Sequence, residues 1–299
     1  MAKREIHTIE NLRSDLRLLG VKPSADLIVH ASLRSIGNIE GGYRNLLQAL
    51  LLAVGSNGTI IAPAFYYGAL DPASHSPHLK SDELRKARAK AKPYDIYLTP
   101  SGEGALGDIV RLDPRSNRCS HPVFSWAVIG ARSAEFTSNI TIDDADGLES
   151  TIGRIYSRGK GQILLLGVDH TSNTSIHLAE SLAKCRHYFE EVIRYKTADL
   201  NWDTFSGCGG CSRGFYKIRG MIDFTKFEIK GKIGNALSYL IEQKPFVDAA
   251  KVALEKKPWG LLCDKVECLS CNRARILYGL PPLEEKEYHL RHPWAQKEK

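Results

Sequence analysis

The feature that most constrains the fold is a short, wholly apolar run at residues 163–166, with glycines at 161 and 167 on either side. A run this short, bounded by glycines, indicates a buried strand. Two further strands are predicted earlier in the chain, at 26–30 and 58–63, with a helix between them at 43–54. A strand, a helix and a second strand connected in this way indicate a parallel pair, and therefore an α/β fold.

A candidate catalytic pair follows the strand at 163–166. After a polar loop, Ser175 can cap a helix that carries His177 and Glu180. These two side chains are three residues apart, so they share one face of that helix. A carboxylate beside an imidazole fixes the tautomer of the ring and stabilises its charged form, which suits a general base. The end of the strand is also where open α/β sheets bind ligands. The alternative is a helix histidine that its neighbouring glutamate merely satisfies.

The composition narrows the class of protein. The chain has 299 residues, of which 43% are hydrophobic and 25% charged, as is typical of soluble globular proteins. No apolar run reaches the roughly 18 residues of a membrane span, and the first residues lack the apolar centre of a signal peptide. We therefore expect a cytoplasmic protein without a membrane partner. Its net charge of +7 is compatible with an anionic ligand such as nucleotide phosphates, or with nucleic acid.

Three polar segments are candidate binding elements. In the loop 32–37, small residues and a glycine would let backbone N–H groups face an anion, although neither a P-loop nor a dinucleotide fingerprint is present. Arg118 could hold a phosphate through two hydrogen bonds. The acidic segment 143–149 could attract an ammonium group through Asp143 and Asp146. Each segment also has a purely structural interpretation: a turn, a surface arginine and a solvated loop.

Seven motifs carry a resemblance to a known family. In chain order they are VHASLRSIG (29–37), GG (41–42), GTIIAPAF (58–65), PYDIYLTPSGEGALGDI (93–109), RCSHPVFSWAVIGARS (118–133), DGLESTIGRI (146–155) and LLLGVDHTSNTSIHLAE (164–180). Together they resemble the antibiotic N-acetyltransferase family, whose best-known members are the aminoglycoside 3-N-acetyltransferases. The resemblance extends over roughly residues 5–262.

The resemblance implies a single α/β domain with a central mixed sheet flanked by helices. It also implies acetyl-coenzyme A as the donor and a small-molecule amine, on an amino sugar or an aminoglycoside, as the acceptor. His177 would act as the general base and Glu180 would orient and polarise it. Asp169, as a further catalytic residue, and Thr174, as a substrate residue, match motif positions near the site. The loop that would hold the coenzyme A pyrophosphate consists of Ser32, Leu33, Arg34, Ser35, Ile36 and Gly37. The same groove would be lined by Arg118, Ser120 and Ser125.

The last third of the chain resembles the family over 227–263 and then departs from it. Over that stretch we expect a strand followed by helices at about 233–241 and 245–256. The chain therefore divides into an acetyltransferase-like body, 1–262, and a cysteine-containing C-terminal extension, 263–299, packed on it.

The cysteines predict a metal site. In a cytoplasmic chain an odd number, here seven, favours thiols or metal ligands over a disulfide framework. Two Cys-x-x-Cys pairs have the spacing of a four-thiolate structural zinc site. The ligands would be Cys208, Cys211, Cys268 and Cys271, and Cys263 could replace one of them. Such a Zn²⁺ would fasten the extension to the body. Free thiols and a disulfide are the alternatives.

The leading hypothesis is thus an acetyl-coenzyme A dependent N-acetyltransferase, active as a monomer or homodimer. Because the chain is basic, it needs local acidity to capture a polycation, which the segment 143–149 could provide. An acyltransferase of a biosynthetic pathway, with another acceptor, fits almost as well. A rival from another class is a zinc-bearing basic binding protein on a degenerate acetyltransferase fold. No stacking aromatics or concentrated basic stripe are evident, so we expect no nucleic-acid partner.

Overall fold

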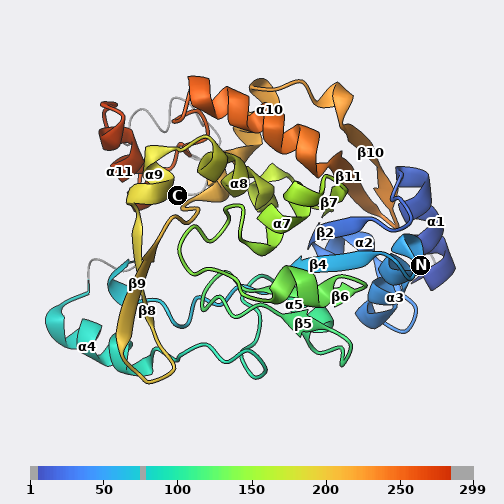
Figure 1. Cartoon of the computed structure of the whole chain (residues 1–299), viewed down its shortest axis with the longest axis horizontal. Helices are drawn as coiled ribbons and strands as arrows, with labels where there is room; N and C mark the ends of the chain where they lie inside the picture. The colour runs from blue at the N-terminus through green and yellow to red at the C-terminus, as the bar shows by residue number, and fades with distance from the viewer. Residues whose placement is uncertain (1–5, 75–78, 284–299) are drawn as a thin grey trace, which may run out of the picture.

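A computed structural model describes residues 6–74 and 79–283 (Figure 1). Its centre is a mixed sheet, which confirms the predicted fold class. The seven strands are, in spatial order, β10 (Glu228–Ile233), β11 (Ala236–Glu242), β7 (Gly161–Leu166), β2 (Asp26–Ala31), β4 (Thr59–Pro63), β6 (Trp126–Gly130) and β5 (Asn117–Arg118). The three predicted strands form the parallel centre, because β2 pairs with β4 on one side and β7 on the other. The outer neighbours are antiparallel.

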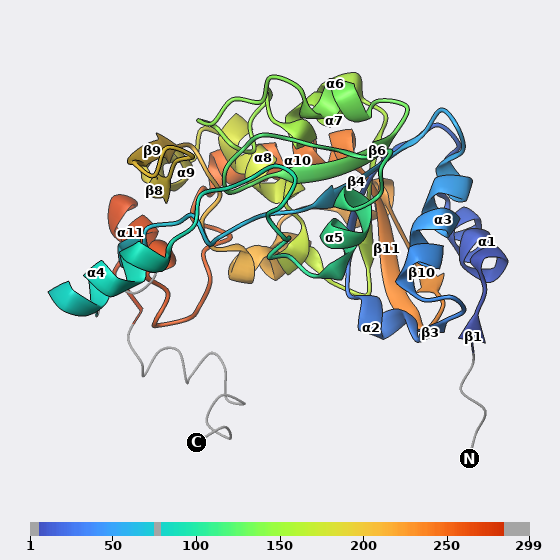
Figure 2. The ribbon, with the colours of Figure 1, turned by 90° about the horizontal axis from the view of Figure 1, so that it is seen from below.

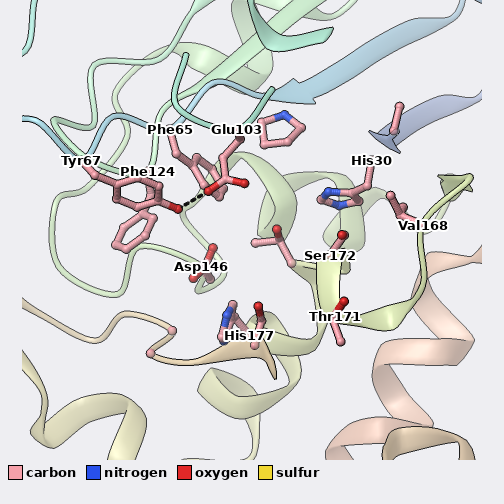
Figure 3. Close-up of a pocket in the computed structure, with 16 residues that line it drawn as sticks. His30, Phe65, Tyr67, Glu103, Phe124, Asp146, Val168, Thr171, Ser172 and His177 are labelled. Atoms are coloured by element: carbon pink, nitrogen blue, oxygen red, sulfur yellow. Dashed lines mark hydrogen bonds between the residues drawn. The ribbon is translucent and has the colours of Figure 1, made fainter. Parts of the chain in front are cut away.

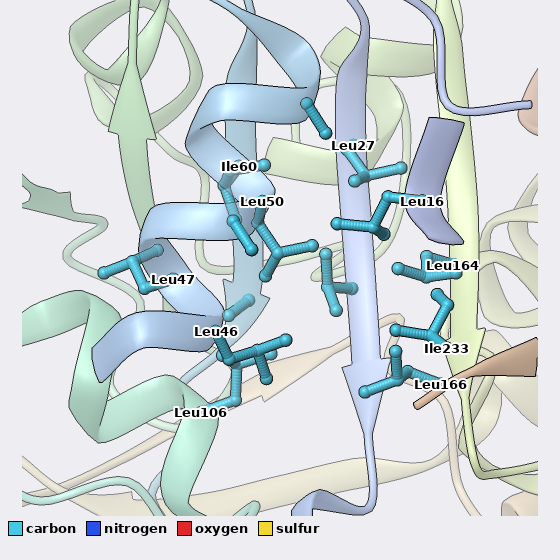
Figure 4. Packing of buried hydrophobic residues seen from close by; sticks show 14 of the residues in the cluster. Leu16, Leu27, Leu46, Leu47, Leu50, Ile60, Leu106, Leu164, Leu166 and Ile233 are labelled. Atoms are coloured by element: carbon cyan, nitrogen blue, oxygen red, sulfur yellow. The ribbon is translucent and has the colours of Figure 1, made fainter. Parts of the chain in front are cut away.

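Helices cover both faces of the sheet, which explains why its central strands are apolar throughout. Successive side chains of a strand point to opposite faces, so Leu27 packs into one core and Ile28 into the other. The first core lies under α1 (Ile9–Leu19), α3 (Tyr43–Val54) and α5 (Ala105–Arg111). The second lies under α7 (Thr151–Arg158), α8 (Ser175–Leu182) and α10 (Gln243–Lys256). Figure 4 shows the first core, with Leu16 of α1 and Leu46 of α3 facing the sheet.

The prediction of a helix at 233–241 is wrong, because this stretch forms the turn of a hairpin and most of its second strand. Residues Ala236–Glu242 form β11, which lies antiparallel to β7, with Leu240 opposite Leu164. It returns from β10 through a tight turn at Gly234, whose φ of 55° is in the left-handed region that glycine favours. The apolar residues that suggested a helix face lie on β11, which pairs with β10 on one side and with β7 on the other. By contrast, the helix predicted at 245–256 is found within α10.

One end of the molecule gathers elements that lie outside the sheet. There, β8 (Val192–Lys196) and β9 (Trp202–Ser206) form an antiparallel hairpin. Figure 2 shows this hairpin at the same end as α4 (Ser81–Lys90), α9 (Arg186–Glu190) and α11 (Leu269–Leu277), away from α1 and α3. Helix α11 belongs to the extension and contacts α9. The extension is described only to residue 283; its last part, 284–299, lies outside the described residues.

The remaining elements are short. They are β1 (Ile6–His7), β3 (Asn38–Ile39), α2 (Leu33–Ile36), α6 (Ser133–Thr137) and the 3₁₀ turns η1 (Pro72–Ser74), η2 (His170–Ser172), η3 (Ser212–Gly220) and η4 (Phe224–Lys226). Among residues 6–74 and 79–283, no helix combines the length and apolarity needed to cross a membrane.

Candidate active site

The structure brings the predicted pair, His177 and Glu180, into direct contact. Both residues are on α8, and Nδ1 of His177 lies 2.7 Å from Oε2 of Glu180. Both are buried, with 8% and 3% of their surface exposed. Burial places this charge-assisted hydrogen bond in a medium of low dielectric, where it is stronger than in water.

The pair is part of a longer hydrogen-bonded chain that the sequence did not reveal. The second oxygen of Glu180, Oε1, lies 3.1 Å from Nε2 of His187, on α9. Nδ1 of His187 lies 2.9 Å from the hydroxyl of Tyr278, just after α11. Burial favours the neutral form of Glu180, yet the hydrogen bonds with His177 and His187 hold its pKa down to about 2. Glu180 is therefore an ionised carboxylate with a protonated nitrogen against each oxygen.

This arrangement determines how His177 can act. An ionised Glu180 can only accept, so Nδ1 of His177 carries a proton and Nε2 is the nitrogen available to a ligand. Burial alone would lower the pKa of His177. The hydrogen bond and charge of Glu180, together with the charge of Asp146, outweigh burial and raise that pKa above its ordinary value. The ring of Phe215 contacts the imidazole at 4.6 Å between centroids.

His177 opens onto a cavity of about 190 Å³ at the carboxyl ends of the parallel strands (Figure 3). Strand β2 contributes His30 and Ala31 to its lining, and β4 contributes Pro63. A second histidine therefore lines the cavity, but it differs from His177. Burial lowers the pKa of His30 to about 3, so this ring is neutral and a weak base. Thr174, a predicted site residue, also lines the cavity.

Two carboxylates make the cavity acidic. Asp146 is 1% exposed, and burial raises its pKa to about 6 against the opposing influence of the charge of His177. Glu103 reaches the cavity from the other side and accepts a hydrogen bond from the hydroxyl of Tyr67 (Figure 3). Of the two predicted acidic residues, Asp146 lines the cavity and Asp143 does not. The carboxylate of Asp143 accepts from the backbone N–H of Ser206 at 2.8 Å and lines a separate surface depression.

An open groove of about 520 Å³ adjoins the cavity. The two spaces share Val168, Thr171 and Ser172 in their linings, at the turn that follows β7. The far wall of the groove is the β10–β11 hairpin, through residues such as Asn235 and Tyr239. A long ligand in this groove can therefore extend one end into the cavity.

The predicted loop 32–37 meets the groove through only one of its side chains. Ser35 lines the groove, and a Cβ on Gly167 would lie 1.8 Å from its Oγ, so loop and strand end are closely packed. Leu33 and Ile36 are buried in the first core, and Arg34 is exposed. Ser32 is half-buried and precedes α2, and Gly37 ends it with a φ of 96°. The loop is therefore partly a core element and partly a wall of the groove.

Asp169 lies on the groove rather than in the cavity. Its carboxylate accepts from the backbone N–H of Thr171 at 2.9 Å and caps η2. It orders the turn between the two spaces, and this contact gives no support to a catalytic role.

Arg118, a predicted cofactor-binding residue, has its hydrogen-bond partners within the protein. It is buried, and its guanidinium donates to Ser125 Oγ at 3.1 Å and to the backbone carbonyls of Ala64 and Thr99. A buried cation has to find partners inside the protein, and here they are backbone and a buried serine. Ser120 is exposed. Arg118 and Ser125 therefore support the strand end behind the cavity, and none of the three lines the cavity or the groove.

The cysteine cluster differs by one member from the predicted ligands. The sulfur atoms of Cys211, Cys263, Cys268 and Cys271 all lie within 4.8 Å of one another. Cys208 lies in a separate apolar cluster with residues such as Phe205. The Cys-x-x-Cys spacing at 208–211 suggested a pair of ligands, but only its second member reaches the group. Cys263, the predicted replacement, takes the fourth place.

Comparison with known proteins identifies the family. The sequence model described as "Aminoglycoside 3-N-acetyltransferase" matches residues 28–255. The chain belongs to this family and is an acyltransferase. An aminoglycoside N(3)-acetyltransferase III of Serratia marcescens is 29% identical over 84% of this chain and 98% of its own length. An aminoglycoside N(3)-acetyltransferase IV of Salmonella is 32% identical over 80% of this chain and 84% of its own length. A mutant of aminoglycoside acetyltransferase AAC(3)-IVa, solved in complex with a gentamicin, superposes with a TM-score of 0.77 at 25% identity. This superposition covers 92% of this chain and 99% of that one.

Proposed function

We propose that the protein transfers an acetyl group from acetyl-coenzyme A to an amine of an aminoglycoside or a related amino sugar. The observation that carries this proposal is a buried His177–Glu180 pair that opens onto an acidic cavity, next to an open groove that shares part of its lining. The names of the relatives support the same reaction and the same class of acceptor.

His177 would serve as the general base. An acceptor amine is protonated at neutral pH and cannot attack a thioester until it loses a proton. Nε2 of His177 would take that proton, while Nδ1–H keeps its hydrogen bond to Glu180 and the carboxylate stabilises the imidazolium. The freed amine nitrogen then forms a bond to the thioester carbonyl carbon, and the carbon–sulfur bond breaks. Coenzyme A leaves as a thiolate and takes up the second proton that the amine loses, while the proton on Nε2 is released to solvent. His30 is a poor substitute for the base, since burial keeps the pKa of its ring near 3.

The acidic lining favours a cationic acceptor. The chain carries a net charge of +7, which by itself repels polycations. Asp146 and Glu103 place two carboxylates at the cavity where the amine has to lie, and these attract a cation locally. An ammonium group beside Asp146 would favour ionisation of this carboxyl, whose pKa is about 6 without it.

The groove fits the donor. Acetyl-coenzyme A is long and flexible, and it would supply the acetyl thioester at the point where groove and cavity meet. Ser35 and Asn235 offer polar contacts to it, and Leu237 and Tyr239 offer apolar surface. Arg118 lines neither the groove nor the cavity, and three of its five N–H donors are used within the protein, so we assign it no contact to the donor.

The test is an acetylation assay. The purified chain is mixed with acetyl-coenzyme A and a panel of aminoglycosides, amino sugars and simple amines, and release of free thiol is followed. We expect release with an aminoglycoside or amino sugar and its loss in His177→Ala. The control is Tyr97→Ala, at a side chain that is 82% exposed and lines neither the cavity nor the groove. Release with simple amines alone would favour the biosynthetic acyltransferase. No release with any acceptor, together with no coenzyme A binding, would refute the proposal.

A further inference from the structure

The cluster formed by Cys211, Cys263, Cys268 and Cys271 has the composition of a closed metal site. All four sulfur atoms lie within 4.8 Å of one another. In a tetrahedral zinc site with Zn–S bonds of about 2.3 Å, the sulfur atoms are about 3.8 Å apart, so a small contraction around an ion would complete the geometry. All four are free thiols in the structure rather than members of a disulfide.

The surroundings of the cluster suit thiolates. The backbone N–H of Cys263 donates to Sγ of Cys271 at 3.2 Å, and Nε of Arg213 donates to Sγ of Cys211 at 3.3 Å. Four thiolates around a divalent ion carry two net negative charges, and such donors offset part of them. Leu262 and Ala274 enclose the sulfur atoms on the apolar side. Soft thiolate ligands select zinc over magnesium or calcium, and a set of four leaves no open position for chemistry.

The ligands come from two distant stretches, one that contacts His177 and one that is linked to Glu180 through His187. Cys211 belongs to the loop 207–211, and the other three belong to the extension after residue 262. In the loop, Gly209 lies directly against His177, because a Cβ on Gly209 would be 2.1 Å from Cγ and Nδ1 of the imidazole.

The extension is linked to the Glu180 end of the pair through His187. Cys268 is the N-cap of α11, and Cys271 is in that helix. Its C-terminal end presents Tyr278, whose hydroxyl is 2.9 Å from His187, and His187 in turn holds Glu180. Ser270 adds a hydrogen bond to Glu191, at 3.0 Å. One ion would thus fix both the loop that covers the imidazole of His177 and the helix that supports its carboxylate partner.

We propose that the four cysteines bind one Zn²⁺ and that this ion positions the catalytic pair. It is a structural ion, since four thiolates leave no open position and none of the four cysteines lines the cavity. Gly209 and Tyr278 act as positioning residues through His177 and His187. The positioning part rests on the proposed function, whereas the metal part is independent of it.

Metal binding is tested on the full chain, expressed in medium supplemented with zinc. Elemental analysis should give one zinc per chain, and Co²⁺ in its place should show the visible absorption of a tetrahedral thiolate site. Cys268→Ser should lose the metal. Cys208→Ser is the matched control, because this buried cysteine lies outside the cluster and its variant should keep the zinc. An unmodified chain that holds neither zinc nor cobalt, or that holds iron instead, would overturn the metal site.

Positioning is tested with Tyr278→Phe, which removes one hydroxyl and leaves all four ligands. Loss of this hydrogen bond should lower kcat about fivefold without changing the zinc content or the KM for acetyl-coenzyme A. A purely structural role of the extension would leave kcat unchanged, and that result would overturn the positioning role. Removal of zinc by a chelator should also broaden the Nδ1 proton resonance of His177. This signal requires no acceptor, so it separates a failure of the positioning role from a failure of the proposed reaction. A resonance that stays sharp in the zinc-free chain would contradict it.

Discussion

Replacement of Glu180 by Gln isolates the contribution of one charge to the base. The side chain keeps its size and an oxygen that can accept from Nδ1 of His177, at 2.7 Å in the wild-type chain. What is lost is the charge of a carboxylate whose pKa is about 2. A hydrogen bond to a charged group is stronger than a neutral one by about 1 to 2 kcal/mol. Because one pKa unit corresponds to about 1.4 kcal/mol, the pKa of His177 should fall by about one unit.

The sign of the effect on the pH profile follows from the state of His177. In the wild-type chain its pKa lies above the ordinary value, so kcat is lost as the pH falls through that raised pKa. In Glu180→Gln the ring stays neutral to lower pH, and the acid limb of the kcat profile should move down by about one unit. The plateau should nevertheless drop about tenfold, since a base of lower pKa takes up the amine proton less readily.

The assay is steady-state thiol release at saturating donor and acceptor across the pH range, with the variant and its control compared with the unmodified chain. The kcat profile is preferred because ionisation of Asp146 near pH 6 affects acceptor binding and would distort kcat/KM. Glu10→Gln is the matched control, since this exposed carboxylate lies on α1 and should change neither limb nor plateau. An acid limb that stays in place or moves to higher pH in Glu180→Gln would refute the assignment of the base.

Three further substitutions test other parts of the site. Asp146→Asn should raise the KM of a cationic acceptor about tenfold at pH 8 while leaving coenzyme A binding unchanged, and steady-state kinetics with Asp143→Asn as the control would measure this. Arg118→Ala should lower the free energy of unfolding in urea by about 3 kcal/mol, because it removes a donor from each of two buried backbone carbonyls, and weaker coenzyme A binding at unchanged stability would contradict the structural role. Gly209→Ala should lower kcat by about a hundredfold or more, since the added Cβ has no space beside the imidazole. A variant with the kcat of the wild-type chain would contradict this, because it would show that the loop moves to make room.

The sequence predicted the centre of the sheet well because burial on both faces leaves a distinctive apolar run. Strand β7 is buried along its whole length, and the predicted strands at 26–30 and 58–63 coincide with β2 and β4. Strand β11 was mistaken for a helix for the opposite reason. Leu237 is 44% exposed and Leu240 is buried, so its apolar residues do not alternate cleanly, and their spacing also fits one helix face. The turn glycine at 234 was the signal that could have decided between the two.

The residues of the candidate site show the same contrast between a clear local pattern and an ambiguous one. Local spacing sufficed for His177 and Glu180, because three residues on one helix fix their distance. It failed for Arg118, whose partners are 54 and 19 residues away at Ala64 and Thr99. A phosphate-binding arginine and a buried structural one have the same sequence signature, and only burial tells them apart. Glu103 gave no local signal either, since it reaches the cavity from a loop.

His187 shows how a backbone detail can decide the membership of a site. It lies seven residues after Glu180, a spacing that would place both on one face if α8 continued. The helix instead ends at Leu182, and Lys184 takes a φ of 55°, which reverses the chain before α9 begins. This reversal brings His187 back to the free oxygen of Glu180, and α9 then provides the surface on which α11 packs. The extension therefore reaches the catalytic pair because one lysine between α8 and α9 adopts a left-handed conformation, and a change that straightens this corner should separate Tyr278 from the base it supports.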